Sequence, residues 1–352
     1  MKRKKRIILL TILFLLSGTL LVGNFFMGPV DKNDETLVVF SVVENQSADT
    51  IISNLEEEGL IKSSFVAKVY IRLTNQSNFQ TGMFELSKSQ SLSSIIKTLN
   101  SMSNAESANV IFLEGWRVID FAEVANTRLG INKEEFLAAC NDKAFIDELK
   151  TKYEVIEKYQ FNSEAIYQLE GLLAPDTYNL NFGISAKELI NVLVAQTNKN
   201  YLENKELFDK SQLDINEIFT LASMVEAEVN TYDDRVLVAS IFMNRIKNKM
   251  SLGSDVTTYY GLQVSMGDRD LTTAELAQVN GYNTRAAEFI GLPIGPICAP
   301  SLESIKAALN YHQTDYLYFV NDKNGKTYPA KTYDQHNEII AELQEKGLWF
   351  VH

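Results

Sequence analysis

The first 26 residues constrain this chain most, because they join a short basic end to a long uncharged segment. Residues 1–6, MKRKKR, carry five basic side chains, and no charged residue occurs from Ile7 to Phe26. A helix of about 20 residues spans roughly 30 Å, the hydrocarbon thickness of a bilayer. Basic flanks stay in the cytoplasm. We therefore predict a cytoplasmic flank at 1–6 and a transmembrane helix at 7–27, with the rest of the chain on the extracytoplasmic side.

A cleaved signal peptide is the alternative interpretation of this segment. Its apolar region is normally shorter, about 7–15 residues, and a cleavage site with small residues follows it. The residues from Gly23 to Phe26 offer no such site. The sequence therefore favours an uncleaved anchor, which makes the protein a single-pass protein of the cell membrane.

Length, charge and cysteine content limit the class of the remaining chain. The 352 residues, 45% of them apolar, suffice for two domains with separate cores. Without the basic flank, 28 basic and 45 acidic residues remain, a net charge of −17. Nucleic acid is therefore not an expected partner, since phosphate binding needs a basic footprint. Cys140 and Cys298 are expected to be two small buried hydrophobic residues, although sequence alone leaves a single bridge between them open.

Turn-forming and periodic segments divide the extracytoplasmic part. Residues 28–36 are polar and turn-rich and are expected to form a linker. Short strand and helix patterns alternate from 37 to 109, with strands expected at 37–43 and 79–86 and helices after Ser47, at 63–73 and at 91–99. Helical patterns dominate from 110 to 352, with strands expected at 110–113 and 316–321 and a hairpin turn at 322–325. The predicted class is α+β, with a small α/β unit at 37–109 and a larger mixed α+β unit at 110–352.

Two glutamates, Glu226 and Glu228, lie two positions apart in the apolar run LASMVEAEV. A capping-box pattern before this run predicts a helix from Ile215 onward. On a helical wheel Glu226 falls inside the apolar stripe, near Phe219, whereas Glu228 falls well outside it. We therefore expect Glu226 to face the core or a cleft and Glu228 to be solvated on the surface.

A carboxyl group on an apolar face loses hydration, which raises its pKa. A glutamic acid that stays protonated near neutral pH can act as a general acid and afterwards as a base. The alternative for Glu226 is an internal ion pair, for example with Arg245 on a second helix expected after Asp233. Segments dense in glycine and proline further along the chain predict fixed loops beside a cleft, although ordinary turn chemistry explains them equally well.

Several motifs occur in a fixed order along the chain. They are LEGLLAPDTY from Leu169, ASMVEAE from Ala222, VASIFMNRI from Val238, YNT from Tyr282, GLPIGPI from Gly291 and YLYFV from Tyr316. Together they resemble the endolytic murein transglycosylase family, the MltG or YceG-like proteins. The similarity extends from the anchor to about Asn337, and the order of the motifs is more specific than any one of them.

The resemblance implies a small LysM-like domain and a catalytic domain outside the membrane. It implies cleavage of the β-1,4 bond between N-acetylmuramic acid and N-acetylglucosamine in peptidoglycan, without cofactor or metal. The catalytic acid of the family, the first glutamate of its V-E-K-E motif, corresponds to Glu226. By resemblance and position, hydrogen bonds to the sugars are expected from Glu170, Tyr178, Asp255, Asn283 and Thr284, although loop capping or core packing would explain these residues equally well. Glycan strands, nascent ones in particular, and cell-wall synthases are the implied partners.

A lytic transglycosylase can work with one carboxyl group. Protonated Glu226 would protonate the glycosidic oxygen and then deprotonate the C6 hydroxyl of the same muramic acid, which closes on C1 and leaves a 1,6-anhydro end. The chain departs from the family where Leu172 and Ala174 replace aromatic residues, Val256 replaces a proline and Arg285 replaces a tyrosine. These departures concern the affinity of the sugar subsites more than the reaction.

Three other classes are consistent with parts of the sequence. A catalytically inactive, membrane-tethered glycan-binding or scaffold protein would show no difference between wild type and Glu226→Gln in a cleavage assay. A pyridoxal-phosphate lyase needs a Schiff-base lysine in a cytosolic fold, which the anchor and the core motifs do not favour. A metallohydrolase is disfavoured because His312, His336 and His352 lack the spacing of metal ligands.

Overall fold

The computed structural model describes residues 25–43, 46–101 and 107–349. The predicted basic flank and nearly all of the predicted transmembrane segment lie outside these ranges. Within them, no helix is long and apolar enough to cross a membrane. The chain divides into two compact units, the first comprising the chain up to Val110 with Val124–Ile131 and Tyr178–Ile184, and the second comprising the rest.

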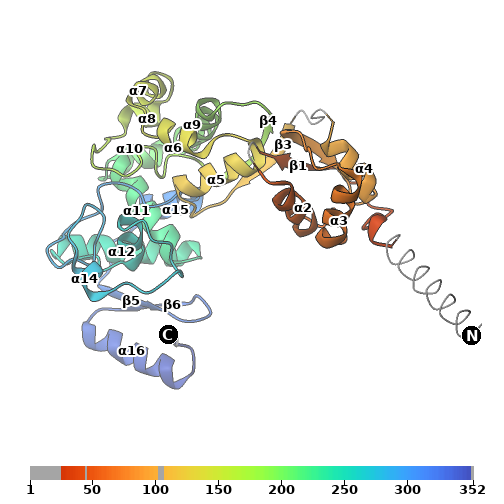
Figure 1. Cartoon of the computed structure of the whole chain (residues 1–352). Coiled ribbons are helices and arrows are strands. Elements are labelled where there is room, and N and C mark those ends of the chain that lie inside the picture. Colours follow the sequence, from red (N-terminus) through yellow and green to blue (C-terminus); the bar gives the residue numbers. More distant parts are fainter. Residues whose placement is uncertain (1–24, 44–45, 102–106, 350–352) are drawn as a thin grey trace, which may run out of the picture. The chain divides into compact units, whose positions relative to one another are not determined.

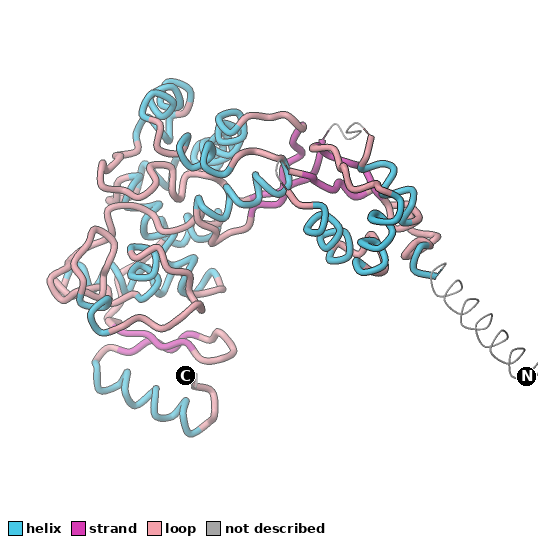
Figure 2. Tube along the Cα trace, viewed as in Figure 1, coloured by secondary structure: helices cyan, strands magenta, loops and turns pink. Residues whose placement is uncertain are grey.

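Helices and short strands mix along the chain, which confirms the predicted α+β class (Figure 2). The strands form separate two-stranded sheets, β1 (Val38–Val42) with β2 (Gly82–Leu86), β3 (Ser107–Phe112) with β4 (Asp176–Asn181), and β5 (Tyr318–Asn321) with β6 (Thr327–Ala330). The helices of the first half are α2 (Ala48–Glu57), α3 (Ser64–Thr74), α4 (Leu92–Leu99), α5 (Val118–Leu129), α6 (Lys133–Ala139), α7 (Lys143–Lys152) and α8 (Glu154–Lys158). Those that follow are α9 (Ala186–Glu203), α10 (Lys205–Lys210), α11 (Ile215–Glu228), α12 (Tyr232–Lys247), α13 (Asp255–Gly261), α14 (Thr273–Ala277), α15 (Leu302–Leu309) and α16 (Tyr333–Glu345).

The first unit has the predicted alternation of strands and helices. Its helices α2, α3 and α4 begin after serines whose hydroxyl groups accept a main-chain N–H, which confirms the predicted starts. Strands β1 and β2 pair antiparallel with Phe40 opposite Phe84, and both rings lie in one core with the buried faces of the helices. The strand predicted at 79–86 is shorter than expected, because Gln80 donates its N–H to the carbonyl of Leu99 instead of to β1.

Helix α11 lies at the centre of the second unit. It begins after Asp214, which forms the predicted capping box with Glu217. It packs against α12, α13 and α15, and every residue from Ile218 to Val225 is buried. The next helix, α12, begins after Thr231 rather than Asp233, because the Thr231 hydroxyl accepts the N–H of Asp234. A helix enclosed on nearly all sides has no single apolar stripe.

Two further features of the second unit frame α11. Strands β5 and β6 form the predicted hairpin, closed by the hydrogen bond from Gly325 N to Asp322 O at 2.9 Å, and α16 packs on this hairpin (Figure 1). The glycine- and proline-rich segment is a fixed loop, since Ile297 N donates to Ser223 Oγ of α11 at 3.0 Å. Cys140 and Cys298 are both buried and unbridged, which confirms their predicted role as small core residues.

Replacing Gly171 by alanine is expected to destabilise the second unit strongly. Gly171 has a φ of 75°, and a Cβ atom there would lie 2.4 Å from Cβ of Pro296 in the fixed loop. Gly115 has a similar φ of 77° but no heavy atom within 4 Å of the same position, so Gly115→Ala is the matched control for backbone strain alone. Strain costs about 1–2 kcal/mol, and urea unfolding should show a clearly larger loss for Gly171→Ala. Equal losses would mean that the loop moves aside without cost.

Candidate active site

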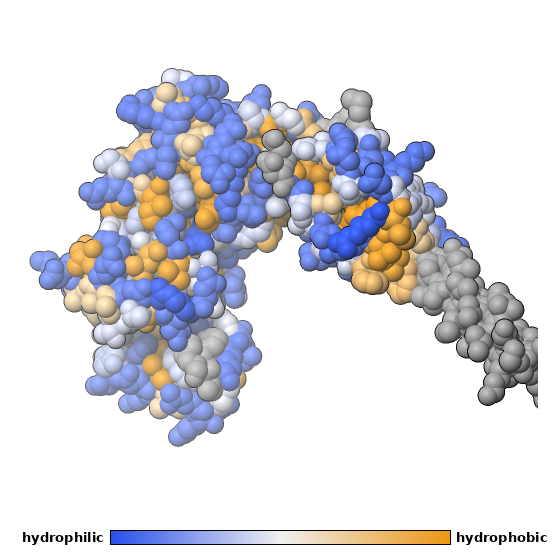
Figure 3. Space-filling model, in the orientation of Figure 1, coloured by the Kyte–Doolittle hydropathy of each residue, from blue (hydrophilic) through white to orange (hydrophobic). Residues whose placement is uncertain are grey.

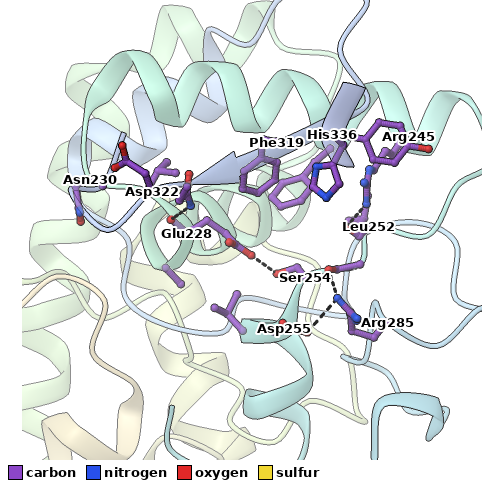
Figure 4. Close-up of a pocket in the computed structure, with 18 of the residues that line it drawn as sticks. Glu228, Asn230, Arg245, Leu252, Ser254, Asp255, Arg285, Phe319, Asp322 and His336 are labelled. Atoms are coloured by element: carbon purple, nitrogen blue, oxygen red, sulfur yellow. Dashed lines mark hydrogen bonds and ion pairs between the residues drawn. The ribbon is translucent and has the colours of Figure 1, made fainter. Parts of the chain in front are cut away.

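A cavity of about 820 Å³ opens in the second unit (Figure 4). Its walls come from the end of α11, from α12, from the start of α13, from the β5–β6 hairpin and from α16. The polar and charged side chains that line it include Glu228, Arg245, Ser254, Asp255, Arg285 and Asp322. Charged and aromatic groups in one recess are typical of a binding or catalytic site.

Glu228 is the last residue of α11 and its carboxyl group lies in this cavity (Figure 4). Ser254 Oγ donates a 2.6 Å hydrogen bond to its Oε1, and Asn321 Nδ2 donates a 3.1 Å bond to its main-chain carbonyl. Burial raises the pKa of Glu228, while the bond from Ser254 opposes this shift. The expectation that Glu228 is fully solvated on the surface is not met, because the side of α11 assigned to solvent faces this cavity and the side chain is only partly exposed.

Glu226 points elsewhere and does not line the cavity. Its Oε1 accepts a 2.8 Å bond from Arg235, and its Oε2 accepts bonds from the N–H and the hydroxyl of Ser301 at 2.8 and 2.5 Å. The side chains of Glu226 and Arg235 are only 7% and 10% exposed. The ion-pair alternative therefore describes Glu226, with Arg235 and not Arg245 as partner. Glu226 joins the end of α11 to the start of α15, and its catalytic role stays a prediction.

Thr284 supports the residue that binds Glu228. It is fully buried and does not line the cavity. Its Oγ1 accepts the N–H of Ser254 at 3.1 Å, and its carbonyl accepts the N–H of Gly253 at 2.9 Å. The structure thus places Thr284 behind the cavity, where it fixes the Ser254 loop, and its predicted contact with a sugar stays a prediction. Sequence reasoning missed Ser254, although this serine directly precedes Asp255, one of the predicted site residues.

Asn283 is likewise a loop brace. It is fully buried, and its Nδ2 donates to three main-chain carbonyls, those of Glu275, Leu276 and Gln278. Its Oδ1 accepts the Thr258 hydroxyl at 2.7 Å. These bonds occupy the amide, so Asn283 is not positioned to contact a ligand. The predicted contact of Asn283 with a sugar stays a prediction, and sequence alone does not distinguish an amide that satisfies main-chain groups from one that binds a ligand.

Of two further predicted sugar-binding residues, Asp255 and Tyr178, only Asp255 lines the cavity. Asp255 lines the cavity, is exposed, and pairs with Arg285 at 3.3 Å. Tyr178 belongs to β4 in the first unit and is not among the residues that line the cavity. Asp255 is therefore the one predicted sugar-binding residue that the described structure brings beside Glu228.

Glu170 is a second buried carboxyl group, away from the cavity of Glu228. It is 1% exposed, and it accepts 3.0 Å bonds from Val118 N and from the Tyr260 hydroxyl. Burial raises the pKa of Glu170 from 4.5 to about 8. Glu170 therefore braces two segments of the second unit, and its predicted contact with the substrate stays a prediction.

This shift predicts that Glu170→Gln flattens the dependence of stability on pH. In the unfolded chain the group ionises near pH 4.5, whereas in the folded chain it ionises near pH 8. The stabilising contribution of the protonated group is thus complete below pH 4.5 and is lost as the pH rises through about 8. The slope for one group is at most about 1.4 kcal/mol per pH unit. Urea unfolding of both proteins across this range tests the prediction, and parallel profiles would contradict it.

Comparisons with known proteins relate the chain to one family. The YceG-like family matches residues 40–342. The chain is 32% identical over 338 residues to the endolytic murein transglycosylase of Bacillus subtilis strain 168, covering 94% of this chain and 93% of that one. It is 30% identical over 333 residues to the protein of the same name from Streptococcus pneumoniae serotype 2 strain D39, and covers 60% of that longer chain.

A solved structure shows the same fold. The crystal structure of a YceG-like protein from Listeria monocytogenes matches with a TM-score of 0.67 at 27% identity, covering 86% of this chain and 99% of that one. The family match spans most of the chain, and the Bacillus subtilis relative is 32% identical and covered over 93% of its own length. The chain therefore belongs to the YceG-like family.

Proposed function

We propose that the protein is an endolytic murein transglycosylase, which cleaves the bond between N-acetylmuramic acid and N-acetylglucosamine inside peptidoglycan strands and leaves 1,6-anhydro ends. The observation that carries this proposal is Glu228, a carboxyl group with a raised pKa in a cavity of about 820 Å³. Two relatives that align with this chain over most of its length bear that name. We assign the role of catalytic acid to Glu228 instead of Glu226.

Glu228 can perform both proton transfers. In its protonated form it gives its proton to the glycosidic oxygen while the bond from that oxygen to C1 breaks. The carboxylate then takes the proton of the C6 hydroxyl, whose oxygen bonds to C1 of the same sugar. No water is consumed, and the internal nucleophile has a high effective concentration. The hydrogen bond from Ser254 stabilises the carboxylate between these two transfers.

The two other carboxyl groups that line the cavity, among the described residues, are already engaged by other partners, which is consistent with a mechanism that uses a single acid. Hydrolases that use two carboxyl groups need both of them at the scissile bond. Asp255 is paired with Arg285 at 3.3 Å. Asp322 is buried and accepts the N–H groups of Asn324 and Lys326 and the hydroxyl of Tyr328. Glu228 is therefore the group best placed for proton transfer.

Product analysis tests the proposed reaction. Purified protein is incubated with uncross-linked peptidoglycan strands, and the products are identified by mass spectrometry. Internal fragments with 1,6-anhydromuramic ends are expected. Reducing muramic ends would show that water is the nucleophile, and Asp255 would become the second carboxyl group to examine. Absence of any product would favour a membrane-tethered glycan-binding protein without activity.

Ser254→Ala is expected to move the alkaline limb of the kcat–pH profile to higher pH. The hydrogen bond from Ser254 favours the ionised form of Glu228 and so lowers its pKa. Without this bond Glu228 stays protonated to higher pH. The variant also loses the stabilisation of the carboxylate during the second proton transfer, so its maximal rate should fall about tenfold. A profile that shifts to lower pH, or does not shift, would show that the hydrogen bond from Ser254 does not lower the pKa of the catalytic acid.

We also propose that the chain is a single-pass membrane protein with a cytoplasmic N-terminus and a LysM-like unit at 37–109. The basic flank and the uncharged segment at 7–26 support the anchor. Such an anchor would keep the active site near nascent strands and near cell-wall synthases, where cleavage would end strand elongation. Protease treatment of intact spheroplasts should remove the part after residue 28, and its protection would contradict the orientation.

A further inference from the structure

A second cavity, of about 280 Å³, adjoins the cavity that holds Glu228. The side chains of Ala227, Val256 and Met266 line both cavities. Ala227 directly precedes the proposed acid, and Met266 is 62% exposed. The two cavities therefore share an apolar wall beside Glu228.

We propose that the second cavity is a glycan subsite, in which the strand continues beyond the sugars held next to Glu228. This inference rests on the proposed function. An endolytic enzyme cuts inside a strand, so sugars extend from both sides of the scissile bond. Binding energy from sugars remote from that bond can serve catalysis, which makes an extended groove useful.

The polar groups of the second cavity suit a sugar. Arg117 and Asp120 both line it and hold one another, since Asp120 Oδ2 accepts the N–H of Arg117 at 2.8 Å and lies 3.8 Å from its Nε. Arg117 Nη2 donates to Ser265 Oγ at 3.2 Å. Within the described part of the chain, Arg117 Nη1 and Asp120 Oδ1 have no partner. Sugars carry hydroxyl and acetamide groups that need both a donor and an acceptor.

The charges that line the second cavity favour a neutral ligand over an anion. The carboxylate of Asp120 offsets the guanidinium of Arg117, so the cavity has no net positive charge to hold a phosphate. Tyr259 and Tyr260 line the same cavity, and Tyr259, which is partly exposed, offers apolar surface to the C–H groups of a sugar. A neutral, amphipathic ligand such as an N-acetylated sugar therefore fits best.

Glu170, which the proposed reaction does not use, holds this cavity in shape. It binds Val118 N, next to Arg117, and the hydroxyl of Tyr260, so it joins two of the walls. The segment before Arg117 is fixed further, because Trp116 O accepts the N–H of Ala299 at 2.7 Å. A buried carboxyl group is costly for stability. Its presence here is explained if ligand binding in the second cavity requires fixed positions of Arg117 and Tyr260.

Strand-length dependence tests the subsite. Arg117→Met keeps the aliphatic stem and removes the donors, and Arg269→Met is the matched control because Arg269 pairs with Glu275 and lines neither cavity. We expect wild type and control to show a kcat/KM that rises with strand length. Arg117→Met should lose about tenfold on long strands and little on short ones. An equal loss on short and long strands would overturn the proposal.

Binding without cleavage separates this inference from the proposed reaction. In a Glu228→Gln background, calorimetry with the same strands should show that Arg117→Met weakens affinity for long strands only. If the wild-type protein cleaves no strands but the Glu228→Gln background shows this pattern of binding, the subsite stands and the proposed reaction fails. Ser265→Phe is a second, independent variant, which would fill the second cavity from a loop and would test the subsite even if Arg117→Met does not fold. Unchanged affinity of both variants for long strands would overturn the subsite.

An independent observation concerns the surface of α3 in the first unit. Phe65, Val69 and Leu73 follow one another at intervals of four residues and are 75%, 41% and 82% exposed. Residues at this spacing share one face of a helix. Figure 3 shows apolar side chains gathered on the first unit beside the point where the described chain begins. Apolar patches of this kind mark interaction surfaces.

We infer that this face of α3 lies in the outer surface of the lipid bilayer, an inference that rests on the proposed anchor. Phe25 stands at the end of the uncharged segment and is 63% exposed. Lys62, two residues before α3, donates to Phe25 O at 3.1 Å, and its ammonium group lies 4.1 Å from the centre of the Phe25 ring. A chain anchored through residues 7–26 would therefore leave the bilayer beside the start of α3.

Depth-dependent quenching tests this inference on the full chain in phosphatidylglycerol-containing nanodiscs. Val69→Cys and the exposed control Glu57→Cys accept a fluorescent label selectively, because Cys140 and Cys298 are buried. Spin-labelled lipid should quench the label at position 69 and not at position 57. Absence of quenching at 69 in protein that resists carbonate extraction would overturn the α3 contact alone. Extraction by carbonate would overturn the anchor as well.

Discussion

Glu228→Gln is expected to lower the turnover of glycan strands by about 10²–10⁴-fold, the usual contribution of a general acid. Glutamine keeps the size of the side chain and can still accept the hydrogen bond from Ser254. It cannot give a proton to the glycosidic oxygen or receive one from the C6 hydroxyl. The substitution should therefore leave the fold and the strand affinity intact, and mass spectrometry of the products gives the rate.

The neighbouring acid supplies the control for this experiment. Glu226→Gln changes the same functional group two residues away and outside the cavity. Its amide oxygen can still accept from Ser301, so the folded variant should retain kcat within a few-fold when it is assayed well below its melting temperature. If Glu226→Gln abolishes cleavage and Glu228→Gln does not, the acid is Glu226, as the sequence motif predicts.

Local signals predicted much of the fold. The starts of α2, α3 and α11 depend on a side chain that caps a main-chain N–H a few residues away, so a short window of sequence contains the whole interaction. The β5–β6 turn is equally local. The start of β2 could not be predicted from a short window, because Gln80 donates its N–H to Leu99 at the end of α4.

The roles of the polar residues near the site depend on partners that are distant in sequence. The wheel of α11 could rank faces by apolar content, but it could not show that α12, α13 and α15 cover nearly every face. Ser254 and Ser301 decide the environments of Glu228 and Glu226, and each lies more than one element away. The positions of Asn283 and Glu170 depend on distant partners in the same way, since main-chain groups elsewhere in the chain bind both side chains.

Glu226→Ala is expected to lower the free energy of unfolding by about 3–5 kcal/mol, the usual cost of removing one partner of a buried ion pair. The change leaves the guanidinium of Arg235, which is 10% exposed, without its carboxylate. It also removes the acceptor of Ser301 N at the start of α15. Arg235 keeps bonds to Val229 O and Ser301 Oγ and a pairing with the exposed Glu303, so the lower end of this range is expected.

A double-mutant cycle with Arg235→Met shows whether the pair itself carries this energy. The uncompensated charge is absent from the double variant, so its loss should be smaller than the sum of the two single losses by about 1–3 kcal/mol. Additive losses would mean that Glu226 acts through Ser301 and α15 alone. The same proteins connect stability to function, because a structural role for Glu226 requires that cleavage by Glu226→Ala follows its folded fraction. A loss of cleavage in fully folded Glu226→Ala would instead give Glu226 a part in the reaction.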